Sequence, residues 1–227
     1  MNRSELLVLI GDLLNDPNHE RYTSNHIYTE LDNSQRKWNT HAKILKDTAT
    51  ISAVTGTRQY ALSNLTGTPI AFTRATFDNI EMDKVDKNWF DLYSSGDWTE
   101  DVGTPNRYFI EALDPDVQYI NVHPTPSDTE NGESIVVEYV KDHTPMASDS
   151  DEPFNASPLM VPYHWGLAYD VASRLLARDP SPENAIRSST YFKISTGVLN
   201  DVQEVFKALE KEEPPRLRGG RYWRSGV

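Results

Sequence analysis

The sequence contains no cysteine, which excludes disulfide bridges and thiolate metal sites. It also lacks a long hydrophobic run: the opening MNRSELLVLIGDLLND turns acidic after a short apolar stretch, and we expect neither a signal peptide nor a membrane span. Basic residues are scarce, 22 against 34 acidic ones, which gives a net charge of −12. This balance argues against a body that wraps nucleic acid, because phosphate neutralisation needs clustered Lys and Arg.

Catalytic signatures are absent as well. The chain has no Gly-rich phosphate loop, no nucleophile elbow, and no pair of histidines one helical turn apart beside a glutamate. We therefore predict no catalytic residue, no metal site and no cofactor. An enzyme built on dispersed histidines and acids is the least favoured alternative. The histidines are His19, His26, His41, His123, His143 and His164.

Two acidic segments invite interpretation as calcium sites. SDSDEP (148–153) lacks the glycine and the distal glutamate that organise a calcium loop, so we interpret it as a solvated linker. In DTENGE (128–133), Asn131-Gly132 lies between two β-rich runs, which predicts a hairpin turn.

Two stretches near the N-terminus have helical periodicity. In residues 4–16 the apolar side chains recur every three or four positions, with Ser4 as a candidate N-cap and Asp16-Pro17 as a stop. A second helix follows YTSNH (22–26), and the two helices should pack together. The apolar positions of the second helix are Ile27, Leu31, Trp38, Ala42 and Leu45.

From Thr48 to about Val140 the helical spacing gives way to short β-rich runs. Residues 47–63 are typical of two strands around a Thr-Gly turn. Residues 83–96 are expected to form one or two helical turns that bury Trp89, Phe90 and Tyr93. The other predicted strands are IAFTRATF (70–77), NRYFIEA (106–112), VQYINVH (117–123) and ESIVVEYV (133–140).

Helical periodicity returns in residues 159–179, where we place Trp165 in the buried stripe. Ser181 then caps a last helix whose first turn contains Pro182. If this helix continues to Glu213, its thirty or so residues span roughly 45 Å, with Gly197 as its weak point. Pro214-Pro215 ends it. Its apolar stripe is Tyr191, Ile194, Val198, Val202, Val205 and Leu209.

Helices at both ends of the sequence and strands in the middle predict an α+β fold. The N- and C-terminal helices form a bundle, and a small antiparallel β domain is inserted between them. The predicted parts are residues 1–47 and 146–213 for the bundle with its connector, 48–145 for the β domain, and 214–227 for an extended C-terminal arm.

The last fourteen residues, PPRLRGGRYWRSGV, carry four arginines and no acidic residue, whereas the preceding 213 residues carry a net charge of −16. The segment has too few apolar groups to fold alone, yet Arg, Tyr and Trp dominate interface energetics. We interpret it as an arm that orders on a partner, with Gly219 and Gly220 as its hinge. A disordered tail and a short nucleic-acid binder are the alternatives. The candidate contact residues are Arg216, Arg218, Arg221, Tyr222, Trp223 and Arg224.

The order of these elements resembles the head-to-tail adaptor (connector, or head-completion) proteins of tailed bacteriophages. The likeness extends from Ser4 to about Glu213, and the sequence departs from the family pattern at residues 64–83 and in its acidic connector. It is carried by the short first helix, the YT helix start, the Trp-bearing helix, the strand pair at 47–63, GTPNRYFIEA (103–112), YINVHPTPSD (119–128), SIVVEYV (134–140), and the paired C-terminal helices with their extension.

The resemblance implies a structural virion protein rather than an enzyme. Such adaptors assemble as a homo-oligomeric ring, typically a dodecamer, under the portal at the head-tail interface. The ring extends the DNA channel, lets the genome pass without specific binding, and offers an attachment surface to a downstream tail or nozzle protein. By the same resemblance, the C-terminal arm docks on the portal protein, and the protein is made in the host cytoplasm without membrane contact.

A ligand-binding module of a virion or cell-surface assembly is the main alternative. In that interpretation Trp98, Tyr108 and Tyr119 of the β domain form stacking platforms for a glycan. Buried strand positions explain most of the same aromatic residues, so we rank this alternative second.

Overall fold

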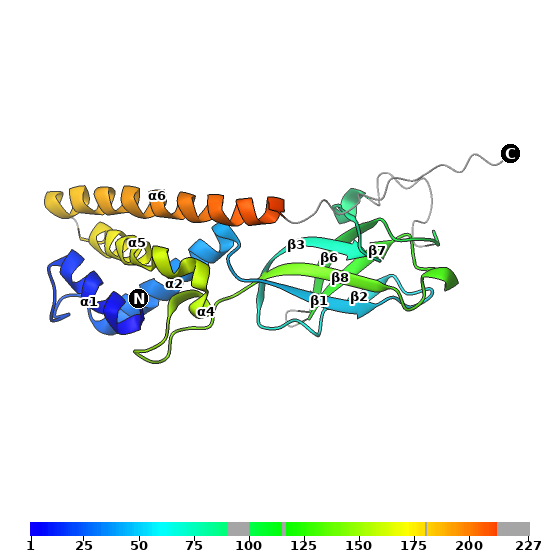
Figure 1. Ribbon diagram of the computed structural model, residues 1–227, viewed down its shortest axis with the longest axis horizontal. Coiled ribbons are helices and arrows are strands. Elements are labelled where there is room, and N and C mark those ends of the chain that lie inside the picture. Colours follow the sequence, from blue (N-terminus) through cyan, green and yellow to red (C-terminus); the bar gives the residue numbers. More distant parts are fainter. Residues whose placement is uncertain (90–99, 115–116, 180, 213–227) are drawn as a thin grey trace. The chain divides into compact units, whose positions relative to one another are not determined.

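The computed structural model describes residues 1–89, 100–114, 117–179 and 181–212. Among these, residues 1–45 and 142–212 form a helical unit, and residues 46–141 form a β unit (Figure 1). The predicted α+β class is confirmed, with helices from both ends of the sequence in one bundle and the strands in a separate unit. The predicted arm lies outside the described residues, as do Pro214 and Pro215.

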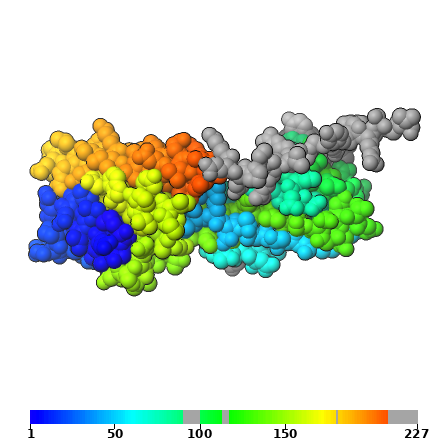
Figure 2. Space-filling view, viewed as in Figure 1, coloured from blue at the N-terminus to red at the C-terminus, as the bar shows by residue number. Residues whose placement is uncertain are grey.

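The helical unit is built around α5, which contacts α1, α2 and α6. Figure 2 shows α1, α5 and α6 side by side on one face of this unit. The largest side chain in its core is Trp38, which is fully buried. The elements are α1 (Arg3–Leu14), α2 (Ser24–Ala42), the short α4 (Pro153–Ala156), the 3-10 helix η2 (Pro158–Tyr163), α5 (His164–Ala177) and α6 (Pro182–Glu212).

The first helix begins two residues earlier than expected. Asn2, not Ser4, is the N-cap: its side chain accepts a hydrogen bond from the backbone N–H of Glu5, and the Glu5 carboxylate accepts one from the Asn2 N–H, both at 2.9 Å. The helix ends at Asn15, whose φ of 55° is left-handed. The first two helices contact each other and share one core, as expected, although α1 packs mainly against α5.

The later helices follow the sequence pattern more closely. In α2 the apolar positions are buried, although the helix ends at Ala42 and Leu45 lies beyond it. Ser181 accepts a hydrogen bond from the N–H of Asn184 at 3.2 Å at the start of α6, and Gly197 does not interrupt this helix. The apolar stripe of α6 is buried at its middle, but Leu209 is 41% exposed.

Trp165 was expected in the core, and this prediction is wrong: its side chain is 39% exposed. The next residue explains the geometry. At Gly166 a Cβ atom would lie 2.6 Å from Cη2 of Trp38 and 2.7 Å from Cγ1 of Val198. The backbone of α5 therefore lies directly against α2 and α6 at Gly166, and Trp165, about 100° away around the helix, faces outward.

Among its described residues, the β unit contains two four-stranded sheets, ordered β1-β8-β3-β4 and β2-β7-β6-β5. All strand pairs within them are antiparallel except β5 with β6. Buried residues of both sheets, such as Phe77, Tyr108 and Ile135, form one core. The elements are β1 (Lys46–Ser52), β2 (Gln59–Ala61), β3 (Pro69–Phe77), β4 (Ile80–Glu81), β5 (Asp83–Lys84), β6 (Arg107–Asp114), β7 (Val117–His123), the 3-10 helix η1 (Asp128–Glu130) and β8 (Ser134–Lys141).

Residues 47–63 form two strands around a turn at Thr55-Gly56, as predicted, but the two strands do not pair with each other: β1 pairs with β8 and β2 pairs with β7, in different sheets. The predicted hairpin at Asn131-Gly132 is wrong, because β7 and β8 belong to different sheets. Gly132, at φ 87°, instead donates its N–H to the carbonyl of Ala53 at 2.8 Å and leads from η1 into β8.

The helical turn expected near Trp89 is present at residues 87–89. The indole of Trp89 is half-buried, and the Arg107 guanidinium lies 4.3 Å from the ring centroid. Phe90 and Tyr93 lie outside the described residues.

Candidate functional site

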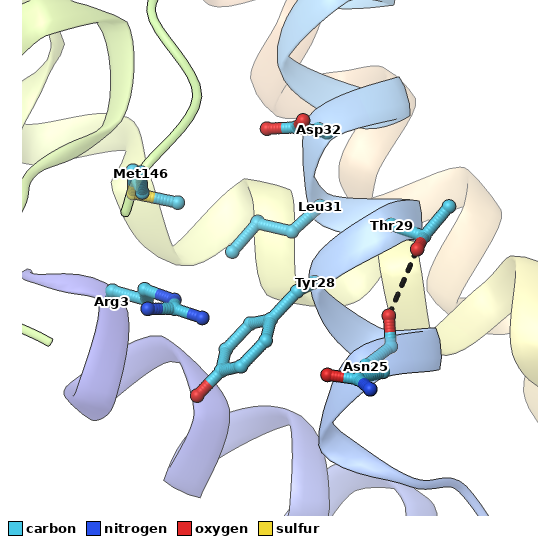
Figure 3. Close-up of a pocket in the computed structure, with 7 residues that line it drawn as sticks. All are labelled: Arg3, Asn25, Tyr28, Thr29, Leu31, Asp32 and Met146. Atoms are coloured by element: carbon cyan, nitrogen blue, oxygen red, sulfur yellow. Dashed lines mark hydrogen bonds between the residues drawn. The ribbon is translucent and has the colours of Figure 1, made fainter. Parts of the chain in front are cut away.

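A hollow of about 470 Å³ lies between the start of α1, the first half of α2 and the connector that follows β8. Figure 3 shows Arg3 of α1 and Tyr28 of α2 pointing toward each other, with Met146 approaching from the connector. The lining residues are Arg3, Asn25, Tyr28, Thr29, Leu31, Asp32 and Met146.

Arg3 is the central side chain of this hollow. Its guanidinium lies 3.6 Å from the centroid of the Tyr28 ring and donates a hydrogen bond to the carbonyl of Ala147 at 2.8 Å. It also lies 3.7 Å from the carboxylate of Asp149, and its backbone N–H donates to the carbonyl of Asp151 at 2.8 Å. Arg3 therefore holds the acidic connector against the first helix.

The connector is exposed at residues 148–150 and 152, as expected of a solvated linker, and its own hydrogen bonds hold it in a defined turn. The Asp151 carboxylate accepts hydrogen bonds from the Ser148 hydroxyl at 2.5 Å and from the backbone N–H groups of Ser148 and Ala147 at 2.8 Å. These bonds, the hydroxyl first, lower the pKa of Asp151. The Asp151 carboxylate therefore stabilises the turn of its own loop by accepting hydrogen bonds from backbone N–H groups.

A second network of polar side chains links α2 to the start of the connector. The buried His143 ring lies between two carboxylates, with Nδ1 3.0 Å from Asp142 and Nε2 3.1 Å from Asp32. Arg36 donates a hydrogen bond to Asp142 at 2.6 Å. Burial raises the pKa of Asp142, but the hydrogen bonds from Arg36 and His143 outweigh it and lower the pKa. The cluster joins α2 to the segment where the chain returns from β8.

The charged side chains that line the hollow already have partners. Arg3 of α1 binds the connector, and Asp32 of α2 binds the His143 ring. Over the described part of the chain, no group of three or more His, Asp or Glu side chains could hold a metal ion. His123 belongs to the β unit, where its ring lies 3.6 Å from the carboxylate of Asp101.

The predicted glycan platform is not available as such. Tyr108 is 1% exposed, and burial raises its pKa to about 12, as expected for a phenol in a hydrophobic core. Tyr119 of β7 is half-buried, and Trp98 lies outside the described residues. A fully buried ring cannot stack on a sugar, so Tyr108 is a core residue.

The predicted arm and hinge all fall outside the described residues, so their role stays a prediction. They are Arg216, Arg218, Gly219, Gly220, Arg221, Tyr222, Trp223 and Arg224.

Sequence reasoning missed the contact of Arg3 and Tyr28 with the connector. Its elements are separated by more than a hundred residues, and no local pattern reports such a contact. The available signal was the placement of a basic residue, Arg3, at the start of an acidic chain that also contains the acidic segment 148–153.

Comparison with known proteins agrees with a structural role. In the part of the chain that the structure describes, no helix has the length and apolar character needed to cross a membrane. No individual curated protein matches the chain. The family model described as SU10 adaptor protein matches residues 1–205, nearly the whole chain. The chain therefore belongs to the SU10 adaptor protein family, and its role is that of a structural bacteriophage adaptor.

Proposed function

We propose that this adaptor forms a ring, of twelve copies, at the head-tail interface of the virion and that its C-terminal arm docks on the portal protein. The observation that carries the proposal is the charge division within the chain: the last fourteen residues hold four arginines and no acid, and the rest has a net charge of −16. A basic aromatic segment fits an acidic groove on a protein partner better than it fits the rest of its own chain.

The proposed ring lines and extends the DNA channel and offers a surface to the next tail component. An acidic wall suits a channel through which DNA slides, because attraction to phosphates would retard the genome.

The long helix α6 supports the arm proposal. Its 31 residues span about 46 Å, and the basic segment follows shortly after this helix in the sequence.

A ring makes a short arm effective. A single fourteen-residue segment binds weakly, since ordering it costs conformational entropy. Several arms on one ring bind one portal ring with a high effective concentration after the first contact. The arm therefore needs only modest affinity per copy.

Truncation tests the arm. A chain that ends at Pro214 is expected to bind purified portal rings at least tenfold more weakly than the full chain, measured by surface-immobilised binding at fixed salt. A full-length variant with Tyr222→Ala and Trp223→Ala keeps the charge and separates anchoring from electrostatics. Equal binding by the truncated and full chains would remove the arm from the proposal.

Electron microscopy tests the ring. The full chain mixed with portal rings should add ring-shaped density on one face of each portal, with a symmetry that gives the copy number. Portals without added density under saturating adaptor would contradict the ring itself, whatever the arm does.

A further inference from the structure

An aromatic stack reaches the surface of the helical unit between α1, α5 and α6. The Trp165 indole packs edge-on against Tyr169, with centroids 5.7 Å apart, and Tyr169 packs edge-on against Tyr191 at 5.3 Å. Val161, one turn before Trp165, is 47% exposed. We call Val161, Trp165, Tyr169 and Tyr191 the Trp165 face. Trp and Tyr held in place by their neighbours lose little entropy on binding, which is typical of interface anchors.

A hollow of about 450 Å³ lies between α5 and α6 and is lined largely by small residues. At its rim the Phe192 side chain is 53% exposed, although aromatic side chains of this size are usually buried. We call this the Phe192 groove. It is lined by Ser173, Arg174, Ala177, Asp179, Ala185, Ser188, Ser189 and Phe192.

The two surfaces lie on opposite sides of the buried stripe of α6. On one side, Tyr191 donates a hydrogen bond to the carbonyl of Leu13 in α1 at 3.4 Å. On the other side, Lys37 of α2 lies 5.6 Å from the Phe192 ring centroid, and Gln203 donates to the carbonyl of His41 in α2 at 3.1 Å. An exposed aromatic face and a hollow on two separate flanks of one unit fit a head-to-tail contact between identical copies.

The exposed charges of these surfaces are complementary. Glu183 and Asp201 of α6 are exposed and, by helical spacing, lie on the α1 side of the helix, where Arg187 is already occupied by the carbonyl of Leu13. On the groove side, Lys193 is exposed one turn beyond Ser189, and the acidic lining residue Asp179 is already paired with Arg21. A cation at the groove can also lie over an incoming indole, because Arg174 is 31% exposed there.

We propose that the Trp165 face of one copy docks in the Phe192 groove of the next copy, with Trp165 as the anchor. This interface rests on the proposed ring and names the surface through which neighbouring copies join. It is a heterologous contact, so each copy contributes one face and one groove; the ring of the proposed function requires in addition that the rotation between neighbouring copies closes.

Two variants that each lose one half of the contact test the proposal. Trp165→Ala removes the anchor, and Ser189→Trp fills the groove at an exposed position that tolerates a larger side chain. Each full-length variant alone should assemble on the order of thirtyfold more weakly than the wild type, the effect of losing one hot-spot residue. An equimolar mixture should form dimers and nothing larger, because each mixed pair has only one intact contact. Sedimentation velocity measures all three samples, and circular dichroism checks that both variants are folded.

Cross-linking gives a second measurement that does not weaken the interface. The chain has no cysteine, so Val161→Cys and Ser189→Cys introduce two unique thiols. With a short bismaleimide, the double variant should give a ladder of covalent oligomers, while each single variant stays monomeric on a denaturing gel.

The outcomes separate this interface from the proposed ring. If wild-type rings form and both substituted variants form them equally well, the interface is wrong and the ring stands. A covalent dimer from the Val161→Cys single variant would mean that the face packs on itself and would overturn the head-to-tail contact. Absence of rings and of ladders, with and without portal rings, would overturn both.

Discussion

At the scale of single residues, Gly166 controls how closely α5 approaches its neighbours. Gly166→Ala places a Cβ 2.6 Å from Trp38 and 2.7 Å from Val198, both in the core. We expect a loss of about 1–3 kcal/mol in the free energy of unfolding, although alanine is the better helix former. Gly197→Ala is the matched control, because a Cβ there meets nothing within 4 Å, and it should stabilise α6 by about 0.5–1 kcal/mol. Urea denaturation compares them; equal effects of the same sign would contradict the packing argument.

Asp170 of α5 is a second single residue on which the stability of the helical unit depends. Its fully buried carboxylate accepts hydrogen bonds from Ser34 and Lys37, both at 2.8 Å, and lies 3.2 Å from Arg174. Asp170→Ala leaves two cations without this partner and should cost about 3–5 kcal/mol. Lys207→Ala removes an exposed pair with Glu204 and should cost less than about 1 kcal/mol. Thermal unfolding of both variants checks the contrast, and a small loss for Asp170→Ala would mean that this network relaxes without it.

At the scale of elements, the loop that carries η1 depends on an ionised Glu130. Hydroxyl groups of Ser127 and Thr104 donate to its carboxylate and lower its pKa to about 2, below the usual 4.5. The lowered pKa stabilises the fold above pH 4.5, and this contribution is lost as the pH falls from 4.5 towards 2. Thr104→Val should raise the pKa of Glu130 in an NMR titration. Glu130→Gln should flatten the dependence of the free energy of unfolding on pH below 4.5. Glu133→Gln is the control in the same loop and should keep the wild-type dependence. Parallel curves for the wild type, Glu130→Gln and Glu133→Gln would contradict this role of Glu130.

The elements also show what the sequence could predict. Alternation and helical spacing are local, so the strands around Ile120 and Val137 and the helix containing Trp38 were predicted correctly. Pairing is not local: β1 pairs with β8 nearly ninety residues away, and a turn signal such as Asn131-Gly132 does not report which sheet each strand joins. Trp165 was misassigned because α5 is buried on most of its circumference, which leaves its apolar spacing with little information about the exposed side. The contacts of Arg3 depend on the same kind of distant pairing.

At the scale of the whole molecule, the β unit is an insertion whose two ends lie together. Lys46, its first residue, pairs with Val140, one position before its last residue Lys141, so the chain enters and leaves on adjacent antiparallel strands, Cα atoms about 5 Å apart. Each unit has its own hydrophobic core. We therefore expect residues 46–141 to fold alone, and the helical unit to fold when a short Gly-Ser linker replaces them.

Each fragment should unfold cooperatively in urea and give dispersed amide signals by NMR. Trp38→Ala should destabilise the helical fragment by about 3–5 kcal/mol, and Ile120→Ala the β fragment by about 2–5 kcal/mol, because each removes a fully buried side chain. In the full chain each substitution should shift one of two transitions and leave the other in place. If both substitutions shift a single common transition, the two units fold as one, and the insertion is a feature of topology without independent stability.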